Sequence, residues 1–153
     1  MIQRINYDNI NDVIDVIYDT TIEFNTSKEI KNTINSKKMF SDFFKESFDD
    51  MEIFGYFVNN KLVGVIGIED NNYIPILYIL KEYQNFNIGS DLINYVVRYL
   101  ENKTNFIDVC AISSTVDFYK KNGFVINGEI KDNKVMLKYS YEKYKNNGGK
   151  YGK

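Results

Sequence analysis

Apolar residues recur along this chain with helical or strand-like periods, most clearly between Ile74 and Leu100. The run from Ile74 to Leu80 is too short for a helix and is typical of a buried strand. A polar loop follows from Lys81 to Ile88, and Gly89 comes directly after it. Beyond Gly89, apolar positions three and four residues apart predict an amphipathic helix. These positions are Leu92, Ile93, Val96, Val97 and Leu100.

This strand, loop and helix could together bind an anion. The first turn of a helix has unpaired backbone N–H groups and the positive end of the helix dipole, so a phosphate is stabilised there. The alternative is an ordinary strand–loop–helix unit without a ligand, because a phosphate loop with few glycines is a weak signal.

The N-terminal part predicts a short strand and a first helix. Ile2 and Ile5 alternate with polar residues within Met1–Tyr7, as in a strand. Asp8 or Asn9 is expected to cap the helix that follows. The apolar face of that helix comprises Ile10, Val13, Ile14 and Ile17.

Two further helices are expected before residue 50. Thr26 and Glu29 fit a capping box, and Ile30 and Ile34 would form the apolar face of the second helix. A third, short helix is expected after Ser41. We expect its aromatic residues to pack in the core rather than to form a substrate wall. These aromatic residues are Phe43, Phe44 and Phe48.

A hairpin is predicted next. The segments Ile53–Val58 and Leu62–Ile68 have the character of strands, joined by the turn Asn59-Asn60, where both residues tolerate positive φ. Gly64 and Gly67 are costly in the second strand unless another group packs close to the backbone.

A second turn, at Asp70–Asn72, leads into the strand that starts at Ile74. Pro75 is informative, because proline donates no backbone hydrogen bond and is found in a central strand only at its first residue or at a bulge. We interpret Pro75 as an irregular start of this strand, with N–H groups nearby left for a ligand.

The C-terminal part predicts a second buried strand, a short helix and a hairpin. The strand, Phe106–Ala111, would pair in parallel with the strand from Ile74 through a right-handed crossover. Ser113 or Ser114 would cap the helix, and Gly123 fits the left-handed position just beyond its end.

The chain then closes with strands at Phe124–Ile126 and Val135–Tyr139 around a polar turn at Lys131–Lys134. From Tyr141 onward there is no periodicity, which predicts a frayed tail over residues 141–153. The length of 153 residues fits a single domain over residues 1–140.

Composition excludes several classes of function. The chain is 44% hydrophobic and 26% charged, as in globular proteins. A net charge of -2 and a pI near 5.2 argue against a nucleic-acid binder. The absence of histidine excludes Ser-His-Asp and Cys-His catalysis and His-ligated metals, and the single cysteine excludes an internal disulfide. No signal peptide or apolar run of transmembrane length is present, so we expect a cytoplasmic protein.

Two motifs make the chain resemble the GCN5-related N-acetyltransferase (GNAT) superfamily. The first is Leu77-Tyr78-Ile79 followed by Gln84-Asn85-Phe86-Asn87-Ile88-Gly89, which is similar to the family's acyl-CoA pyrophosphate loop. The second is Phe118-Tyr119-Lys120-Lys121-Asn122-Gly123-Phe124, which is similar to the family's aromatic-Tyr-x-x-x-Gly-Phe. The order of the expected elements also resembles the family, over roughly residues 1–140.

The resemblance implies a fold and an activity. The fold would be α/β, with a mostly antiparallel mixed sheet, a central parallel pair of strands and flanking helices. The activity would be direct transfer of acetyl from acetyl-CoA to a primary amine of a small molecule or peptide, in a ternary complex without an acyl-enzyme. The partners would be acetyl-CoA and that amine, without nucleic acid or membrane, and the chain would be a monomer or homodimer.

The resemblance also implies site residues. Tyr119 would contact the cofactor and protonate the departing thiolate. Glu69 is the first candidate for the base, with Asp70 and Tyr73 behind it, and a water chain would serve equally well. Backbone groups of the strand would bind the pantetheine, and amides of the loop would bind the pyrophosphate. The cofactor-binding residues would be Leu77, Tyr78, Ile79, Gln84, Asn85, Phe86, Asn87, Ile88, Gly89, Ser90, Ser114 and Tyr119.

The chain departs from the family pattern at two places. Asn87 stands where a glycine is usual, and asparagine is the residue that most readily adopts left-handed conformations after glycine. Ile112-Ser113-Ser114 replaces an asparagine often found near the last helix, where a serine hydroxyl could form a similar hydrogen bond.

A non-catalytic acyl-CoA binding or sensor module remains the main alternative to the transferase function. An RNA-directed transferase is a weaker one that the acidic balance disfavours.

Overall fold

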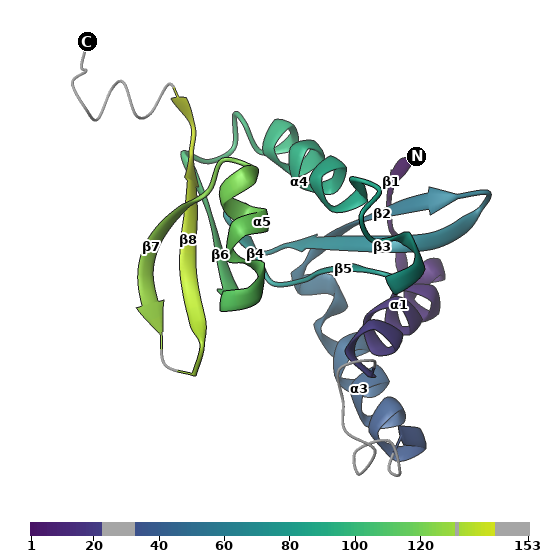
Figure 1. Ribbon diagram of the computed structural model, residues 1–153. Helices are drawn as coiled ribbons and strands as arrows, with labels where there is room; N and C mark the ends of the chain where they lie inside the picture. The colour runs from purple at the N-terminus through teal and green to yellow at the C-terminus, as the bar shows by residue number, and fades with distance from the viewer. Residues whose placement is uncertain (23–32, 131, 143–153) are drawn as a thin grey trace. The chain divides into compact units, whose positions relative to one another are not determined.

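The computed structural model describes residues 1–22, 33–130 and 132–142. The chain divides into two compact units. The first contains Met1–Gly67 and Ile76–Leu92, and the second contains Ile68–Pro75 and Ile93–Lys153. Each unit is built on a four-stranded sheet (Figure 1). The predicted mixed α/β class is confirmed, whereas the prediction of one domain over residues 1–140 stays a prediction.

The sheet of the first unit has the strand order β1-β2-β3-β5. Its strands are β1 (Ile2–Arg4), β2 (Glu52–Val58), β3 (Lys61–Ile68) and β5 (Leu77–Ile79). The predicted hairpin between β2 and β3 is confirmed. Asn59 and Asn60 have φ values of 49° and 68°, the positive values that a two-residue hairpin turn needs to match the twist of its strands.

Among the described residues of the first unit, two helices lie in the N-terminal third of the chain, and each has a short 3-10 turn at one end. They are α1 (Ile10–Ile22) after η1 (Tyr7–Asn9), and α3 (Thr33–Ser47) before η2 (Phe48–Asp50). The predicted apolar face of α1 is confirmed, because its four residues are buried in the core together with Ile5, Ile53 and Val65. Asn6 caps the preceding turn η1, where its Oδ1 accepts a hydrogen bond from the Asp8 N–H at 3.0 Å. The cap of α1 at Asp8 or Asn9 stays a prediction.

The prediction of a short helix starting after Ser41 is wrong, because Ser41 lies inside α3. The predicted cluster began at Phe43, but the aromatic residues that contact one another begin at Phe40, one turn earlier in α3. Phe43 is 68% exposed, whereas Phe40, Phe44 and Phe48 lie four residues apart and their rings contact one another in succession, with centres 5.8 and 6.4 Å apart. The predicted capping box and most of the second apolar face, at Thr26, Glu29 and Ile30, lie outside the described residues, as does the Ile34 side chain.

The expected strand from Ile74 to Leu80 is broken into two strands that belong to different sheets. β4 (Tyr73–Ile74) lies in the second unit and β5 in the first. Pro75 therefore does not start the strand. It interrupts the strand, because its nitrogen carries no hydrogen to continue a ladder.

The glycines of β3 accept side chains from the segment after this break, as predicted. A Cβ atom on Gly67 would lie 2.8 Å from Ile76 Cγ1, and one on Gly64 would lie 2.7 Å from Ile79 Cδ1. Both distances are shorter than real Cβ contacts. The two glycines therefore let β5 pack directly against β3.

The sheet of the second unit has the order β4-β6-β8-β7. Its longer strands are β6 (Phe106–Ile112), β7 (Val125–Ile130) and β8 (Lys134–Ser140). A parallel pair is present, but it joins only the two residues of β4 to Asp108 and Val109 of β6. The predicted buried strand is confirmed as β6, and burial alternates along it, with Ile107, Val109 and Ala111 inside.

The remaining described helices lie within or next to the two sequence motifs. They are η3 (Lys81–Tyr83), α4 (Ile88–Tyr99), η4 (Ser113–Thr115) and α5 (Val116–Lys121). The predicted apolar face of α4 is confirmed at Leu92, Ile93, Val96 and Leu100, which are fully buried. The predicted serine cap of α5 is wrong, because Thr115 stands at that position and its hydroxyl donates backward to Ile112 O at 2.9 Å.

Tyr141 belongs to the folded part of the chain, and the prediction of fraying from this residue is wrong. Tyr141 is 4% exposed, and its hydroxyl donates to the Val97 carbonyl of α4 at 2.6 Å. The rest of the predicted tail, from residue 143, lies outside the described residues. Among the helices of the described residues, none has the length and apolar character needed to cross a membrane.

Candidate functional site

Strand β5 is an edge strand of its sheet, so one of its two edges faces β3 and the other does not. Gly67 N donates to Ile76 O at 3.0 Å and Leu80 N donates to Val63 O at 2.9 Å, and Tyr78 pairs with Val65 between them. Paired residues alternate along an antiparallel ladder, so the backbone groups of Tyr78 face β3. Those of Leu77 and Ile79 face the opposite edge. This edge offers donors and an acceptor to an extended ligand, as the edge of any sheet does to another strand.

The loop after β5 is tied to this edge by Gln84. Its Nε2 amide donates to Ile79 O at 2.9 Å, which leaves the N–H and C=O of Leu77 and the N–H of Ile79 facing outward. The Gln84 side chain therefore fixes the start of the loop. The Tyr78 side chain packs against the core of the first unit.

The loop contains two residues in the left-handed region. Asn85 has φ 70° and Asn87 has φ 66°. The expectation that asparagine can replace glycine at position 87 is confirmed, because the short polar side chain of asparagine tolerates this conformation. Backbone turns of this kind aim successive N–H groups at a common point, which forms a concavity for an anion.

Helix α4 starts directly after this loop. Asp91 N donates to Asn87 O at 2.9 Å, so the helical hydrogen bonding begins at Asn87. The amides of Ile88, Gly89 and Ser90 belong to the first turn, which has no intrahelical acceptors. Asn85, Phe86 and Asn87 are exposed and Ile88 is buried, so the loop is accessible while its helical end is fixed to the core.

Tyr119 lies in the second unit and is 8% exposed. Its ring meets the rings of Phe118 and Phe124 edge to face, at 5.1 and 5.6 Å. Its carbonyl accepts from Phe124 N at 3.0 Å while Gly123 N donates to Lys120 O at 3.1 Å. This pair of bonds, with φ 97° at Gly123, is a Schellman motif, so the predicted left-handed glycine is confirmed.

The two serines next to α5 differ in their surroundings. The Ser113 hydroxyl is hydrogen-bonded to the Asn133 side chain in the turn between β7 and β8, and Ser113 N donates to Asn133 O at 2.9 Å. Ser114 is exposed in the same 3-10 turn.

Glu69 also lies in the second unit, at a tight turn. Its backbone pairs with Tyr73 through two hydrogen bonds, of 2.8 and 3.0 Å, across the turn at Asp70 and Asn71, where φ is 56° and 61°. The predicted turn is therefore confirmed. Burial, followed by the charges of Cys110, Glu69 and Asp108, raises the pKa of the Tyr73 phenol above its usual value. The phenol therefore stays protonated at neutral pH, which makes Tyr73 a weaker candidate base than Glu69.

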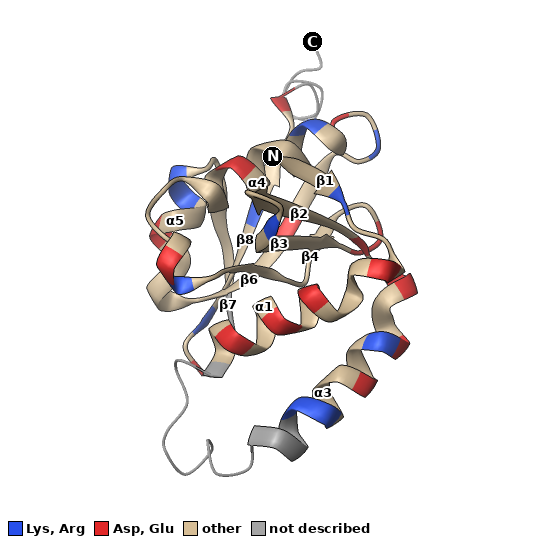
Figure 2. Cartoon of the chain, turned by 90° about the vertical axis from the view of Figure 1, so that its right-hand side faces the viewer, with Lys and Arg blue, Asp and Glu red and all other residues tan. Residues whose placement is uncertain are grey.

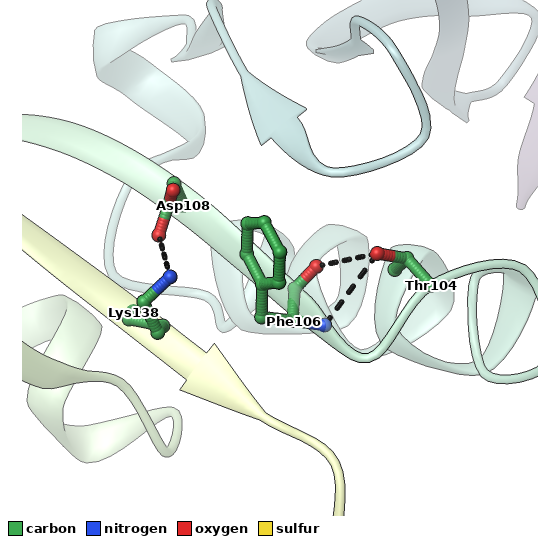
Figure 3. Close-up of polar contacts among 4 residues, drawn as sticks. All are labelled: Thr104, Phe106, Asp108 and Lys138. Carbon is green, nitrogen blue, oxygen red and sulfur yellow. Dashed lines mark hydrogen bonds and ion pairs between the residues drawn. The ribbon is translucent and has the colours of Figure 1, made fainter. Parts of the chain in front are cut away.

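An ion pair in the second unit escaped the sequence reasoning. Asp108 pairs in register with Tyr73 on one side and with Lys138 on the other. Lys138 Nζ lies 3.0 Å from Asp108 Oδ1, an ion pair without hydrogen-bond geometry, and 3.7 Å from the centre of the Phe106 ring (Figure 3). Alternation within β6 and β8 was the signal that could have placed these side chains on one face.

The predicted site residues fall into two groups. The residues assigned to the strand and loop, from Leu77 to Ser90, are brought together in the first unit. Glu69, Ser114 and Tyr119 belong to the second unit. Among the described residues, no three side chains of the His, Cys, Asp or Glu types are grouped to hold a metal ion.

A comparison with family models decides what kind of protein this is. The model of the acetyltransferase (GNAT) domain matches residues 19–144, more than half of the chain. This chain belongs to the GNAT acetyltransferase family. A comparison with curated protein sequences finds no match.

Solved structures resemble this GNAT chain in fold. The PaiA N-acetyltransferase of Thermoplasma acidophilum, in complex with coenzyme A, is 20% identical with a TM-score of 0.73, over 92% of this chain and 98% of that one. A GCN5-related N-acetyltransferase of Rhodopseudomonas palustris is 15% identical with a TM-score of 0.75, over 92% and 94%. A GNAT family acetyltransferase of Elizabethkingia anophelis with acetyl-CoA bound is 21% identical with a TM-score of 0.56, over 65% and 82%. At these identities the likeness shows the GNAT fold.

Proposed function

We propose that this GNAT chain transfers the acetyl group of acetyl-CoA directly to a primary amine of a small molecule or peptide. The observation that carries the proposal is the outward edge of β5, which continues into a left-handed loop and the first turn of α4. A long thioester with a pyrophosphate fits both features, because it is extended at one end and doubly charged at the other. Family membership and the coenzyme A or acetyl-CoA bound to two of the related structures support the same choice.

The edge of β5 would hold the pantetheine arm as an additional strand. The arm contains two amides, and Leu77 and Ile79 offer two N–H donors and one carbonyl acceptor on this side. Tyr78 would then contribute its position in the ladder with β3 rather than backbone contacts to the ligand. The Leu77 N–H, or one next to it, would also polarise the thioester carbonyl as the tetrahedral intermediate forms.

The pyrophosphate would bind the amides of the loop and of the first turn of α4. The segment from Gln84 to Ser90 supplies these donors, and the helix dipole adds favourable electrostatics. Asn85 and Asn87 set the loop conformation through their positive φ values. The contacts are made by backbone groups, so a glycine-poor loop can perform the function that glycine performs elsewhere in the family.

The chemical step would need a base and an acid. An amine is protonated at neutral pH, so it must lose a proton before its nitrogen attacks the thioester carbon. The C–N bond then forms, the nitrogen loses its second proton to solvent as the amide is produced, the C–S bond breaks, and the thiolate takes a proton. We propose that Glu69, or a water chain leading to it, takes the first proton, and that Tyr119 donates the proton to the thiolate. The reference pKa of tyrosine, about 10, lies above that of a thiol, about 8.5, so this transfer needs a hydrogen bond between the phenol and the sulfur.

The acidic character of the first unit fits a cationic acceptor. Helix α1 has aspartates at positions 12, 15 and 19 and no lysine or arginine, and Figure 2 shows them along the helix. A negative surface raises the local concentration of amines carrying positive charge. Lys37 pairs with Asp15 at 2.8 Å, which reduces this field only locally.

A non-catalytic acyl-CoA sensor is the second candidate. One observation favours it. The packing of Tyr119 against Phe118 and Phe124 and its carbonyl in the Schellman motif give this residue a structural role that needs no catalysis.

A thiol-release assay separates the two functions. Purified protein is mixed with acetyl-CoA and a panel of polyamines, amino acids and short peptides, and free CoA and acetylated amine are both quantified. Equal amounts of the two products above the protein-free background support a transferase. Acetyl-CoA binding without turnover on any amine favours the sensor, and absence of binding at millimolar acetyl-CoA contradicts both.

A further inference from the structure

Phe86 is an aromatic residue in an accessible loop. It lies between β5 and α4, and 69% of its surface is exposed. Single exposed apolar residues are common on proteins, so exposure alone indicates nothing. What distinguishes Phe86 is its position, because it lies within the loop whose amides, with those of the first turn of α4, form the proposed anion site.

The backbone that carries Phe86 is fixed on both sides. Gln84 bonds to Ile79 O before it, and Asn87 O accepts the first helical bond of α4 after it. Its two neighbours, Asn85 and Asn87, adopt left-handed conformations that few other residues tolerate. The ring is therefore presented to solvent from an ordered backbone and contributes little to the core.

We infer that Phe86 is the platform on which the adenine base of acetyl-CoA stacks, an assignment that rests on the proposed function. In a nucleotide the base is separated from the phosphate by a single ribose. A base whose pyrophosphate is bound by the amides from Asn87 to Ser90 therefore lies within reach of side chains of the same loop. Every base has a π-face, and aromatic side chains are the residues on which proteins stack bases.

Calorimetry with two thioesters tests the assignment. Acetyl-CoA carries the adenosine moiety, and acetyl-4′-phosphopantetheine lacks it. Phe86→Ala should weaken acetyl-CoA binding roughly 5- to 100-fold, the range of a single base–aromatic stack. The same substitution should leave the affinity for acetyl-4′-phosphopantetheine unchanged, and Phe86→Tyr should restore the affinity for acetyl-CoA because it keeps the ring.

Phe43→Ala is the matched control. Phe43 lies in the same unit and is 68% exposed, but it belongs to α3, so its removal should leave both affinities unchanged. In the NMR spectrum of the wild-type complex, Phe86 ring protons should show NOEs to adenine H2 or H8.

The outcomes separate this assignment from the proposed function. If wild-type protein binds acetyl-CoA and Phe86→Ala binds it equally well, the stacking assignment is wrong and the proposed function stands. An equal loss for both thioesters would also overturn the assignment, because it would show that Phe86 acts through the loop backbone. If the wild type binds neither thioester, the proposed function fails together with this assignment.

Discussion

The rings of Tyr119 and Phe124 meet edge to face at 5.6 Å, and the Phe124 N–H donates to the Tyr119 carbonyl at 3.0 Å. They occupy the two positions of a Schellman motif that make a hydrophobic contact across the helix end. The spacing Tyr-x-x-x-Gly-Phe is therefore explained by the way α5 ends. The motif alone does not decide whether the Tyr119 hydroxyl takes part in catalysis.

Tyr119→Phe separates the two roles. The ring contacts remain, so the free energy of unfolding should change by no more than about one hydrogen bond, 0.5–1.5 kcal/mol. Loss of a general acid should lower kcat by about a hundred- to ten-thousandfold, with the affinity for acetyl-CoA unchanged. Steady-state kinetics and calorimetry are the measurements.

Tyr139→Phe is the control, because the Tyr139 ring also contacts the Phe124 ring, with ring centres 5.7 Å apart. This substitution should leave kcat unchanged. Full kcat for Tyr119→Phe, in conditions where chemistry limits the rate, would mean that Tyr119 is only a packing residue.

Asn87 should tolerate glycine but not alanine. Its φ of 66° costs an alanine about 1–2 kcal/mol and costs glycine almost nothing. Asn87→Ala should therefore lower both stability and acetyl-CoA affinity, and Asn87→Gly should keep the affinity. Denaturant unfolding and calorimetry measure the two effects.

Asn60→Ala is the matched control for this pair. Asn60 has φ 68° in the turn between β2 and β3, so its substitution should cost similar stability and leave acetyl-CoA affinity intact. If Asn87→Ala and Asn60→Ala have the same effect on affinity, the loop does not bind the ligand.

Local patterns in the sequence predicted much of the fold. The pair Asn59-Asn60 predicted the hairpin turn, the period of Leu92 and Val96 predicted α4, and Gly123 predicted the end of α5. These features depend on residues close in the chain, whose conformational preferences are intrinsic. The same is true of the left-handed Asn87 in the candidate site.

Features that depend on distant contacts were missed. The apolar run Ile74–Leu80 gave no sign that Pro75 divides it between two sheets, because both halves are equally suited to strands. Phe43 and Phe44 are neighbouring residues of the same type, so the sequence alone does not tell which one is buried. The packing of α3 buries Phe44 and exposes Phe43. Tyr141 lies in a polar segment, and its hydroxyl bonds to the Val97 carbonyl, 44 residues away.

Tyr141 should stabilise the fold in a pH-dependent way. Tyr141→Phe removes the donor to Val97 O and leaves this carbonyl at the end of α4 without that partner, at a cost of about 1–3 kcal/mol at neutral pH. Burial, followed by the neighbouring Tyr139 and Glu101, raises the pKa of the Tyr141 phenol in the folded state.

The sign of the pH effect follows from this shift. The unfolded chain loses the Tyr141 proton near its reference pKa of about 10, before the folded protein does. The stabilisation is therefore complete below pH 10 and decreases as the pH rises above it. Thermal unfolding between pH 7 and 11 should show a smaller alkaline loss for Tyr141→Phe than for the wild type. Parallel curves would show that the phenol is not selectively protonated in the folded state.

The central claim is that the loop and the first turn of α4 bind acetyl-CoA through backbone amides. Gly89 tests it, because it is the second residue of α4, where the helical conformation itself needs no glycine. Gly89→Ala should stabilise the fold by up to about 1 kcal/mol through helix propensity. Its Cβ should obstruct close approach of the pyrophosphate and weaken binding by about 1–2 kcal/mol.

Titration calorimetry with acetyl-CoA on the wild type, Gly89→Ala and the exposed helix variant Asn94→Ala is the decisive measurement. The account predicts a Kd in roughly the micromolar range for the wild type and for Asn94→Ala, and a Kd about 5- to 30-fold higher for the more stable Gly89→Ala. Equal affinities for all three proteins, or no binding by the wild type at millimolar acetyl-CoA, would contradict it.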